Sequence, residues 1–210
     1  MSSQFASRIP EMIRNLSLLY RARTPQDDAL GRAWYPNAHR IVTDWSDSYQ
    51  LPIATVASVI AAISPQCVWE RNLILADDVL AERAPSVYGA LPANLAKAQR
   101  IRANRATDIT AYFKSGPKVS SFACNLAGDW DIVTVDTHAA QAALNDVEST
   151  VSLKPTVYAD FAEAYRHAAW GLDILPAHFQ ATIWHMWKRL YPRSVKLTRR
   201  RQWHVISTEV

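Results

Sequence analysis

Apolar residues recur at helical spacing along nearly the whole chain. They predict a first helix over residues 7–20 and a second over 28–49, with a break near Tyr35-Pro36 because proline interrupts the hydrogen bonding of a helix. Residues 53–63 are apolar on nearly every side, which predicts a buried central helix. The first third of the chain is therefore expected to be helical throughout.

The same spacing continues to the C-terminal part of the chain. The pattern predicts helices over 69–82, one or two basic amphipathic helices within 92–113, and further helices over 118–127, 137–144 and, in two pieces, 158–191. Residues 132–135 are β-branched, but four residues form an extended connector more readily than a strand. The fold class predicted is all-α.

Composition places the chain among folded globular proteins. It has 210 residues, of which 49% are hydrophobic and 20% charged. No apolar run suits a signal peptide or a membrane span, so we expect a soluble, intracellular, cytoplasmic protein without a membrane partner. Two cysteines, Cys67 and Cys124, are too few for a four-thiolate cluster, and we expect no cofactor, no metal and no obligate protein partner.

Positive charge is concentrated in two stretches of the chain. Residues 97–118 carry six basic side chains against Asp108, and residues 193–210 carry five against Glu209, while the net charge of the whole chain is only +4. Such clustering favours a polyanionic partner, because clustered cations displace the counterions of a nucleic acid. A solvated surface with a basic tail is the equal alternative at this point.

Residues 115–139 hold the candidate chemistry. Gly116 can adopt the backbone angles of a tight hairpin, and Pro117 suits the first position of a helix, whose free N–H groups form a phosphate site. Lys118 follows in the first turn, where the helix dipole disfavours the protonated amine, and a neutral amine can attack a sugar C1′. Eighteen residues later, Asp136 opens the next helix, where a carboxylate can stabilise an oxocarbenium-like sugar.

This stretch resembles the signature of the helix-hairpin-helix (HhH-GPD) DNA glycosylase superfamily. The spacing from Lys118 to Asp136 is that of the endonuclease III branch, and Val135-Asp136-Thr137-His138 matches its motif residue for residue. The resemblance implies catalytic roles for Lys118, the nucleophile in base release and strand nicking, and for Asp136, the stabiliser of charge. The iron–sulfur motif of that branch is absent, so the relative implied is a cluster-free one.

The resemblance also implies an architecture and a DNA-binding surface. It implies two helical lobes with an active-site cleft between them: an N/C-terminal lobe of residues 1–50 and 146–210, and an abbreviated barrel lobe of residues 51–145 with its helix-hairpin-helix at about 108–127. Gln66 matches the residue that enters the duplex after base flipping. The residues expected to contact double-stranded DNA are Gln66, Arg102, Arg105, Lys114, Ser115, Gly116, Pro117 and His138.

Several functions and simpler interpretations stay open at this stage. The first function is a DNA glycosylase and AP lyase of base excision repair, which flips a damaged or modified base out of the duplex and removes it. The second is a viral enzyme that modifies a DNA base on the same scaffold, acting in a host cytoplasm, and the third is an inactive DNA-binding relative. Lys118 could also be an ordinary exposed lysine at the start of a helix, and Asp136 could serve as an ordinary helix cap. Gln66 could simply close a turn, and Trp184 and Trp187 are most simply core residues.

Overall fold

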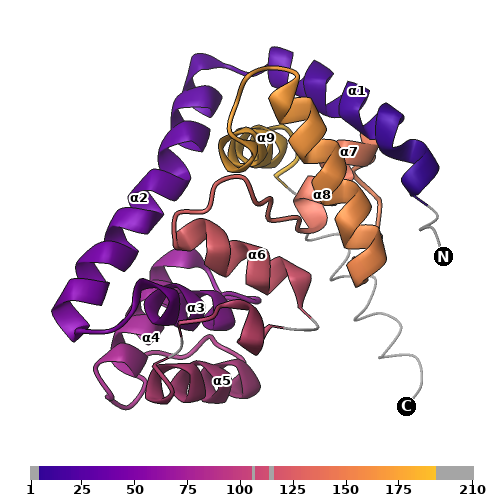
Figure 1. Ribbon diagram of the computed structural model, residues 1–210. Helices are drawn as coiled ribbons and strands as arrows, with labels where there is room; N and C mark the ends of the chain where they lie inside the picture. Colours follow the sequence, from indigo (N-terminus) through magenta and orange to yellow (C-terminus); the bar gives the residue numbers. More distant parts are fainter. Residues whose placement is uncertain (1–4, 106, 114–115, 193–210) are drawn as a thin grey trace. The chain divides into compact units, whose positions relative to one another are not determined.

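The computed structural model describes residues 5–105, 107–113 and 116–192, and in that part of the chain every regular element is a helix (Figure 1). The all-α prediction is confirmed. The elements are η1 Ala6–Arg8, α1 Ile9–Arg21, α2 Pro25–Tyr49, α3 Ile53–Ile63, α4 Trp69–Leu80, α5 Pro92–Ala103, η2 Thr110–Tyr112, α6 Pro117–Leu126, α7 Thr137–Leu144, α8 Pro155–Trp170 and α9 Pro176–Leu190.

The chain divides into two compact units. Unit 1 is Met1–Trp34 together with Val135–Val210, and unit 2 is the continuous segment Tyr35–Thr134. These divisions lie 16 residues and 11 residues before the boundaries expected at 50/51 and 145/146. The difference has a physical cause. Helix α7 packs on α1 and α9 and therefore belongs to unit 1. The second half of α2 belongs to unit 2, where His39 Nδ1 lies 2.9 Å from the carbonyl oxygen of Leu126.

Unit 1 is built around the first helix of the chain. The buried residues of α1 recur every four positions, at Met12, Leu16 and Tyr20, and this face packs on α7, α8 and α9 (Figure 1). Phe161 of α8 and Phe179 of α9 are completely buried in the same core. A side chain at Gly31 of α2 would collide with the backbone of Thr182, so α2 meets α9 at a position that only glycine can occupy.

The predicted break at Pro36 is wrong, because α2 continues through it from Pro25 to Tyr49. Proline leaves the carbonyl of the residue four positions earlier without a helical partner, and here that residue is Arg32. Arg32 is exposed, so water can bond to its carbonyl. The cost of proline is therefore small enough for the helix to continue.

Unit 2 forms around α3, as predicted from its almost entirely apolar sequence. Nine of its eleven residues are buried, and α4, α5 and α6 pack against it (Figure 1). A fully buried Asn125 at the end of α6 then turns the chain. Its amide donates to the carbonyls of Asp129 and Ile132 at 2.8 and 2.7 Å, and its oxygen accepts from Thr134 Oγ1 at 2.7 Å. These bonds fix the extended connector that leads out of unit 2.

The helix expected before the hairpin is reduced to a single 3₁₀ turn, Thr110–Tyr112. The cause lies at the end of α5: Arg105 adopts a positive φ of 46°, which stops the helix after Ala103. Between Arg105 and Gly116, the described residues 107–113 form this 3₁₀ turn and no α-helix. The second helix of the predicted motif is present as α6, so only half of the expected helix-hairpin-helix is α-helical.

Candidate functional site

Asp136 lies at the N-cap of α7, with an extended backbone (φ −112°, ψ −174°). Its Oδ1 accepts the backbone N–H of Ala139 at 2.8 Å, which satisfies one of the free donors in the first turn of the helix. Its Oδ2 accepts the indole N–H of Trp184 in α9 at 3.1 Å. Both oxygens of this half-buried carboxylate therefore have a fixed donor.

The residues around Asp136 hold its backbone in place. Val135 is fully buried, and its N–H donates to the hydroxyl of Tyr158 at 3.0 Å. Tyr165 donates its hydroxyl to the carbonyl of Ala139, also at 3.0 Å. Burial and, secondly, the negative charge of Asp136 raise the pKa of Tyr165 well above its ordinary value, so this phenol remains a donor. Two tyrosines of α8 thus fix the start of α7.

Aromatic and cationic side chains surround the indole that holds Asp136. The Lys188 ammonium lies 4.0 Å from the centre of the Trp184 ring, and the His138 ring meets Trp184 edge-on at 6.4 Å. The ring of His185 meets it at 5.2 Å, also edge-on. Burial, and then the charge of Lys188, lower the pKa of His185, which favours its neutral form. Within unit 1, Asp136 and His138 therefore both contact Trp184.

In unit 2, Lys118 is the second residue of α6 and is exposed. Gly116 is the N-cap and provides no side-chain cap, and an added side chain there would meet no atom within 4 Å. Pro117 has no N–H, so the backbone N–H groups of Lys118 and Val119 form the open end of the helix. Such an end favours an anion such as a phosphate.

Gln66 is exposed and has a positive φ of 63°. It occupies the third position of a turn in which the N–H of Cys67 donates to the carbonyl of Ser64 at 3.1 Å. Pro65 occupies the second position, and proline is favoured there in turns whose third residue has a positive φ. Gln66 thus closes a turn, and its side chain is still available at the surface.

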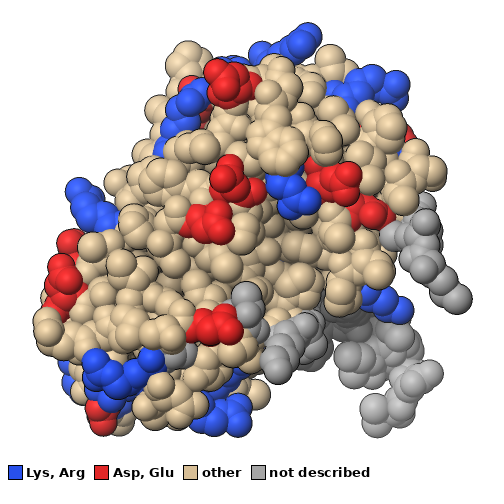
Figure 2. All heavy atoms as spheres, in the orientation of Figure 1, with Lys and Arg blue, Asp and Glu red and all other residues tan. Residues whose placement is uncertain are grey.

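The two arginines expected to bind DNA have partners within unit 2. Arg102 forms an ion pair with Glu82 and also donates to the carbonyl of Leu80 at 3.3 Å. Arg105 donates to the carbonyl of Gln50 at 2.6 Å. Lys114, Ser115 and the basic residues of 193–201 lie outside the described residues. On the face drawn in Figure 2, the basic and acidic side chains of the described residues are interspersed.

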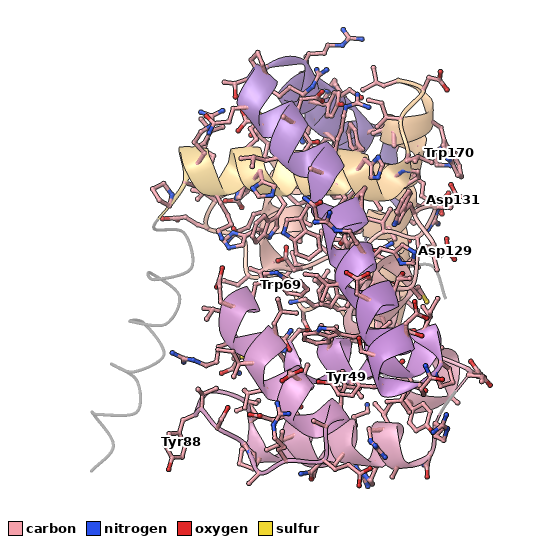
Figure 3. The ribbon with its side chains drawn as sticks, turned by 90° about the vertical axis from the view of Figure 1, so that its left-hand side faces the viewer. Tyr49, Trp69, Tyr88, Asp129, Asp131 and Trp170 are labelled. Carbon is pink, nitrogen blue, oxygen red and sulfur yellow. The ribbon has the colours of Figure 1, made fainter. Side chains whose placement is uncertain are left out.

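Three tryptophans are candidates for stacking against a base, and they differ in exposure. Trp69 at the start of α4 is half-buried against Phe122, with ring centres 6.4 Å apart, and Trp130 meets His39 edge-on at 6.2 Å. Trp170 at the end of α8 is 54% exposed (Figure 3). Of the three, Trp170 has the largest accessible surface for an added ring.

Metal binding and membrane insertion have no candidate among the described residues. No group of three His, Cys, Asp or Glu side chains gathers there as metal ligands do. Within the same ranges, no helix has the length and apolar character needed to cross a membrane.

Comparison with known proteins gives a family. Residues 2–190 match the model of a family of unknown function, DUF7178. The chain belongs to this family. No curated protein and no solved structure matches the chain. The matched segment includes both Lys118 and Asp136, and also the helix α9 that contributes Trp184.

Trp184 is the residue whose place at the site was missed in the sequence. Its interpretation as a core residue fails because it is half-buried and bonds to a carboxylate. The signal available was the four-residue spacing to Lys188, which places a cation and an aromatic ring on one face of a helix. That spacing indicates a contact between the two, but it says nothing of Asp136.

Proposed function

We propose that this protein is a DNA glycosylase-like enzyme that flips a damaged or modified base out of duplex DNA and cleaves its N-glycosidic bond. The observation that carries the proposal is the position of Asp136 and the hydrogen bonds that its carboxylate accepts. It caps α7 directly after a buried extended connector, within the motif Val135-Asp136-Thr137-His138, and a donor holds each of its oxygens. A carboxylate fixed in this way suits the stabilisation of positive charge that develops on a sugar.

The chemistry proposed for Lys118 is nucleophilic. Its neutral amine bonds to C1′ of the target nucleotide while the bond from C1′ to the base breaks, and the departing base takes up a proton. Loss of the amine proton and opening of the sugar ring give a Schiff base, from which the DNA strand can be cleaved by elimination. The exposure of Lys118 at the open start of α6 supports this role, because its amine is accessible to a DNA strand.

The open helix end supports a second part of the proposal. The N–H groups at the start of α6 would receive a phosphate next to the target nucleotide, and Gln66 would occupy the space that the flipped base leaves. Both features belong to unit 2. Phosphate contacts would still contribute most of the affinity for the duplex, so binding should weaken as salt rises.

Borohydride trapping tests this function. Labelled duplexes containing uracil, thymine glycol, 8-oxoguanine or an abasic site are incubated with the protein and borohydride, and covalent adducts are separated by gel. We expect an adduct with the wild type and none with Lys118→Gln. Lys154→Gln is the matched control, because Lys154 is also an exposed lysine at the start of a helix, at the N-cap of α8. We expect Asp136→Asn to bind DNA but to lose base release.

The results separate the candidate functions. An adduct that requires Lys118 identifies a glycosylase with lyase activity, and the duplex that yields it names the class of lesion. Base release without an adduct leaves a monofunctional glycosylase. DNA binding with neither product contradicts the proposal and favours a base-modifying enzyme or a purely binding relative.

A further inference from the structure

We infer that Trp184 sets the direction of the Asp136 carboxylate and, resting on the proposed function, is a positioning residue for base release. The backbone N–H of Ala139 holds Oδ1 at 2.8 Å, as any capped helix start would. One such bond leaves the carboxylate free to pivot about it. The indole N–H, at 3.1 Å from Oδ2, prevents this, because a rotation that keeps one bond breaks the other.

The chemistry of the two donors defines what the carboxylate does. An indole N–H and a backbone N–H can only donate, so both oxygens of Asp136 act as acceptors in this arrangement. Each oxygen keeps a second lone pair. Because the carboxylate cannot rotate, the directions in which these lone pairs point are fixed. A preorganised acceptor of this kind stabilises a developing cation without having to reorient during the reaction.

The Trp184 indole is itself contacted by a cation above the ring face and by two imidazole rings edge-on. The Lys188 ammonium above the ring draws electron density towards it, which makes the indole N–H a stronger donor. The edge-on rings of His138 and His185 limit tilting of the indole. All of these residues belong to unit 1, so the positioning of Asp136 is complete within that unit.

The alternative is that the bond from Trp184 to Asp136 has a purely structural role. The bond joins residues 48 positions apart and could serve only to tie α9 to α7. Trp187 offers a matched comparison, because it lies on the same helix and its indole N–H donates to Gln141 of α7 at 3.4 Å. Loss of either indole bond should lower stability, but only the loss of the Trp184 bond should affect the chemistry of Asp136.

The first test is single-turnover base release on a duplex that the wild type processes. We expect Trp184→Phe to lower the rate by about tenfold to a hundredfold with unchanged duplex affinity, since misplacement of a catalytic group by about 1 Å costs this much. We expect Trp187→Phe to keep the rate. An equal loss in Trp187→Phe, or an unchanged rate in Trp184→Phe, overturns the inference.

The second test requires no activity. In the ¹⁵N spectrum, the indole resonance of Trp184 is the one missing in Trp184→Phe. We expect Asp136→Asn to move this resonance upfield, because asparagine has a single acceptor oxygen, which keeps the cap of α7 and leaves the indole N–H without its carboxylate acceptor. The Trp187 resonance should stay in place. If the Trp184 resonance does not move, the inference fails. If it moves in a protein that releases no base, the coupling stands and the proposed function fails.

Discussion

At the scale of single residues, Gln66 combines strain with exposure. A positive φ of 63° is costly for a residue with a side chain, and glycine adopts it at no steric cost. The turn alone gives no reason for a glutamine there. A residue that keeps a strained conformation at the surface is a candidate for a functional side chain.

We predict that Gln66→Gly raises the free energy of unfolding by about 0.5–1 kcal/mol but weakens base release and duplex binding. Gln50→Gly is the control, because Gln50 is an exposed glutamine of the same unit with a φ of 51°. Gln50→Gly should gain less stability, because the side-chain amide of Gln50 donates to the carbonyl of Asp47 at 2.6 Å, and it should keep full activity. Urea unfolding and base-release assays measure the two effects. Full activity of Gln66→Gly would show that Gln66 only closes the turn.

Single residues of the site differ in how far the sequence predicts them. The N-cap role of Asp136 follows from local order alone, because the aspartate stands directly before a helical pattern, and it is confirmed. The bond to Trp184 depends on the packing of α9 against α7, which no local pattern encodes. The DNA contacts expected of Arg102 and Arg105 stay predictions, and the bonds of these residues within unit 2 depend on packing that no local pattern encodes.

At the scale of elements, α2 and α9 are joined by one ion pair. Arg189 donates two bonds to the buried Asp27, at 2.9 and 2.6 Å. Asp27 and Thr24 also cap α2 reciprocally: the N–H of Thr24 donates to the Asp27 carboxylate at 2.9 Å, and the N–H of Asp27 donates to Thr24 Oγ1 at 3.1 Å. The bond from Arg189 is the main cause of the strong lowering of the Asp27 pKa.

We predict that Asp27→Asn destabilises the protein at neutral pH by about 1–2 kcal/mol, the usual cost of losing a cap and a charged bond. A lowered pKa in the folded state gives stability that is present above the unfolded value of about 4 and is lost as pH falls below it. The difference between wild type and variant should therefore be constant from pH 7 to 5 and shrink below about pH 4. Urea unfolding across this range measures it, with exposed Asp44→Asn as control. A difference as large at pH 3 as at pH 7 would contradict this role of Asp27.

Elements with a continuous pattern and a clear local start were predicted best. The helix over 53–63 was expected with its observed bounds because its residues are apolar on nearly every side, and the helix over 137–144 because Asp136 caps it. The break predicted at Pro36 was wrong because the cost of proline in a helix depends on whether the freed carbonyl is exposed to water. Exposure is set by tertiary packing, which the local sequence does not show. The single 3₁₀ turn at Thr110–Tyr112 depends on the positive φ of Arg105, for which the sequence has no marker.

At the scale of the whole molecule, each unit has a core of its own. We predict that Phe179→Ala, at a fully buried position of unit 1, speeds hydrogen exchange in α1, α7, α8 and α9 more than in α3, α5 and α6. Ile60→Ala, fully buried in unit 2, should do the reverse. Each should cost about 2–5 kcal/mol. Exchange followed by mass spectrometry measures the effect, and equal acceleration in both units would show that they unfold as one.

The order of synthesis has a different consequence for each unit. Unit 2 is one continuous segment, so all of its helices have been made once residue 134 has been added. The buried face of α1 must wait much longer, because α7, α8 and α9 follow unit 2 in the chain. Domains generally fold as units during synthesis, so unit 2 can fold on the ribosome while Met12, Leu16 and Tyr20 still lack their partners. In a cell, this first helix is the segment that a chaperone would need to cover until the last helix emerges.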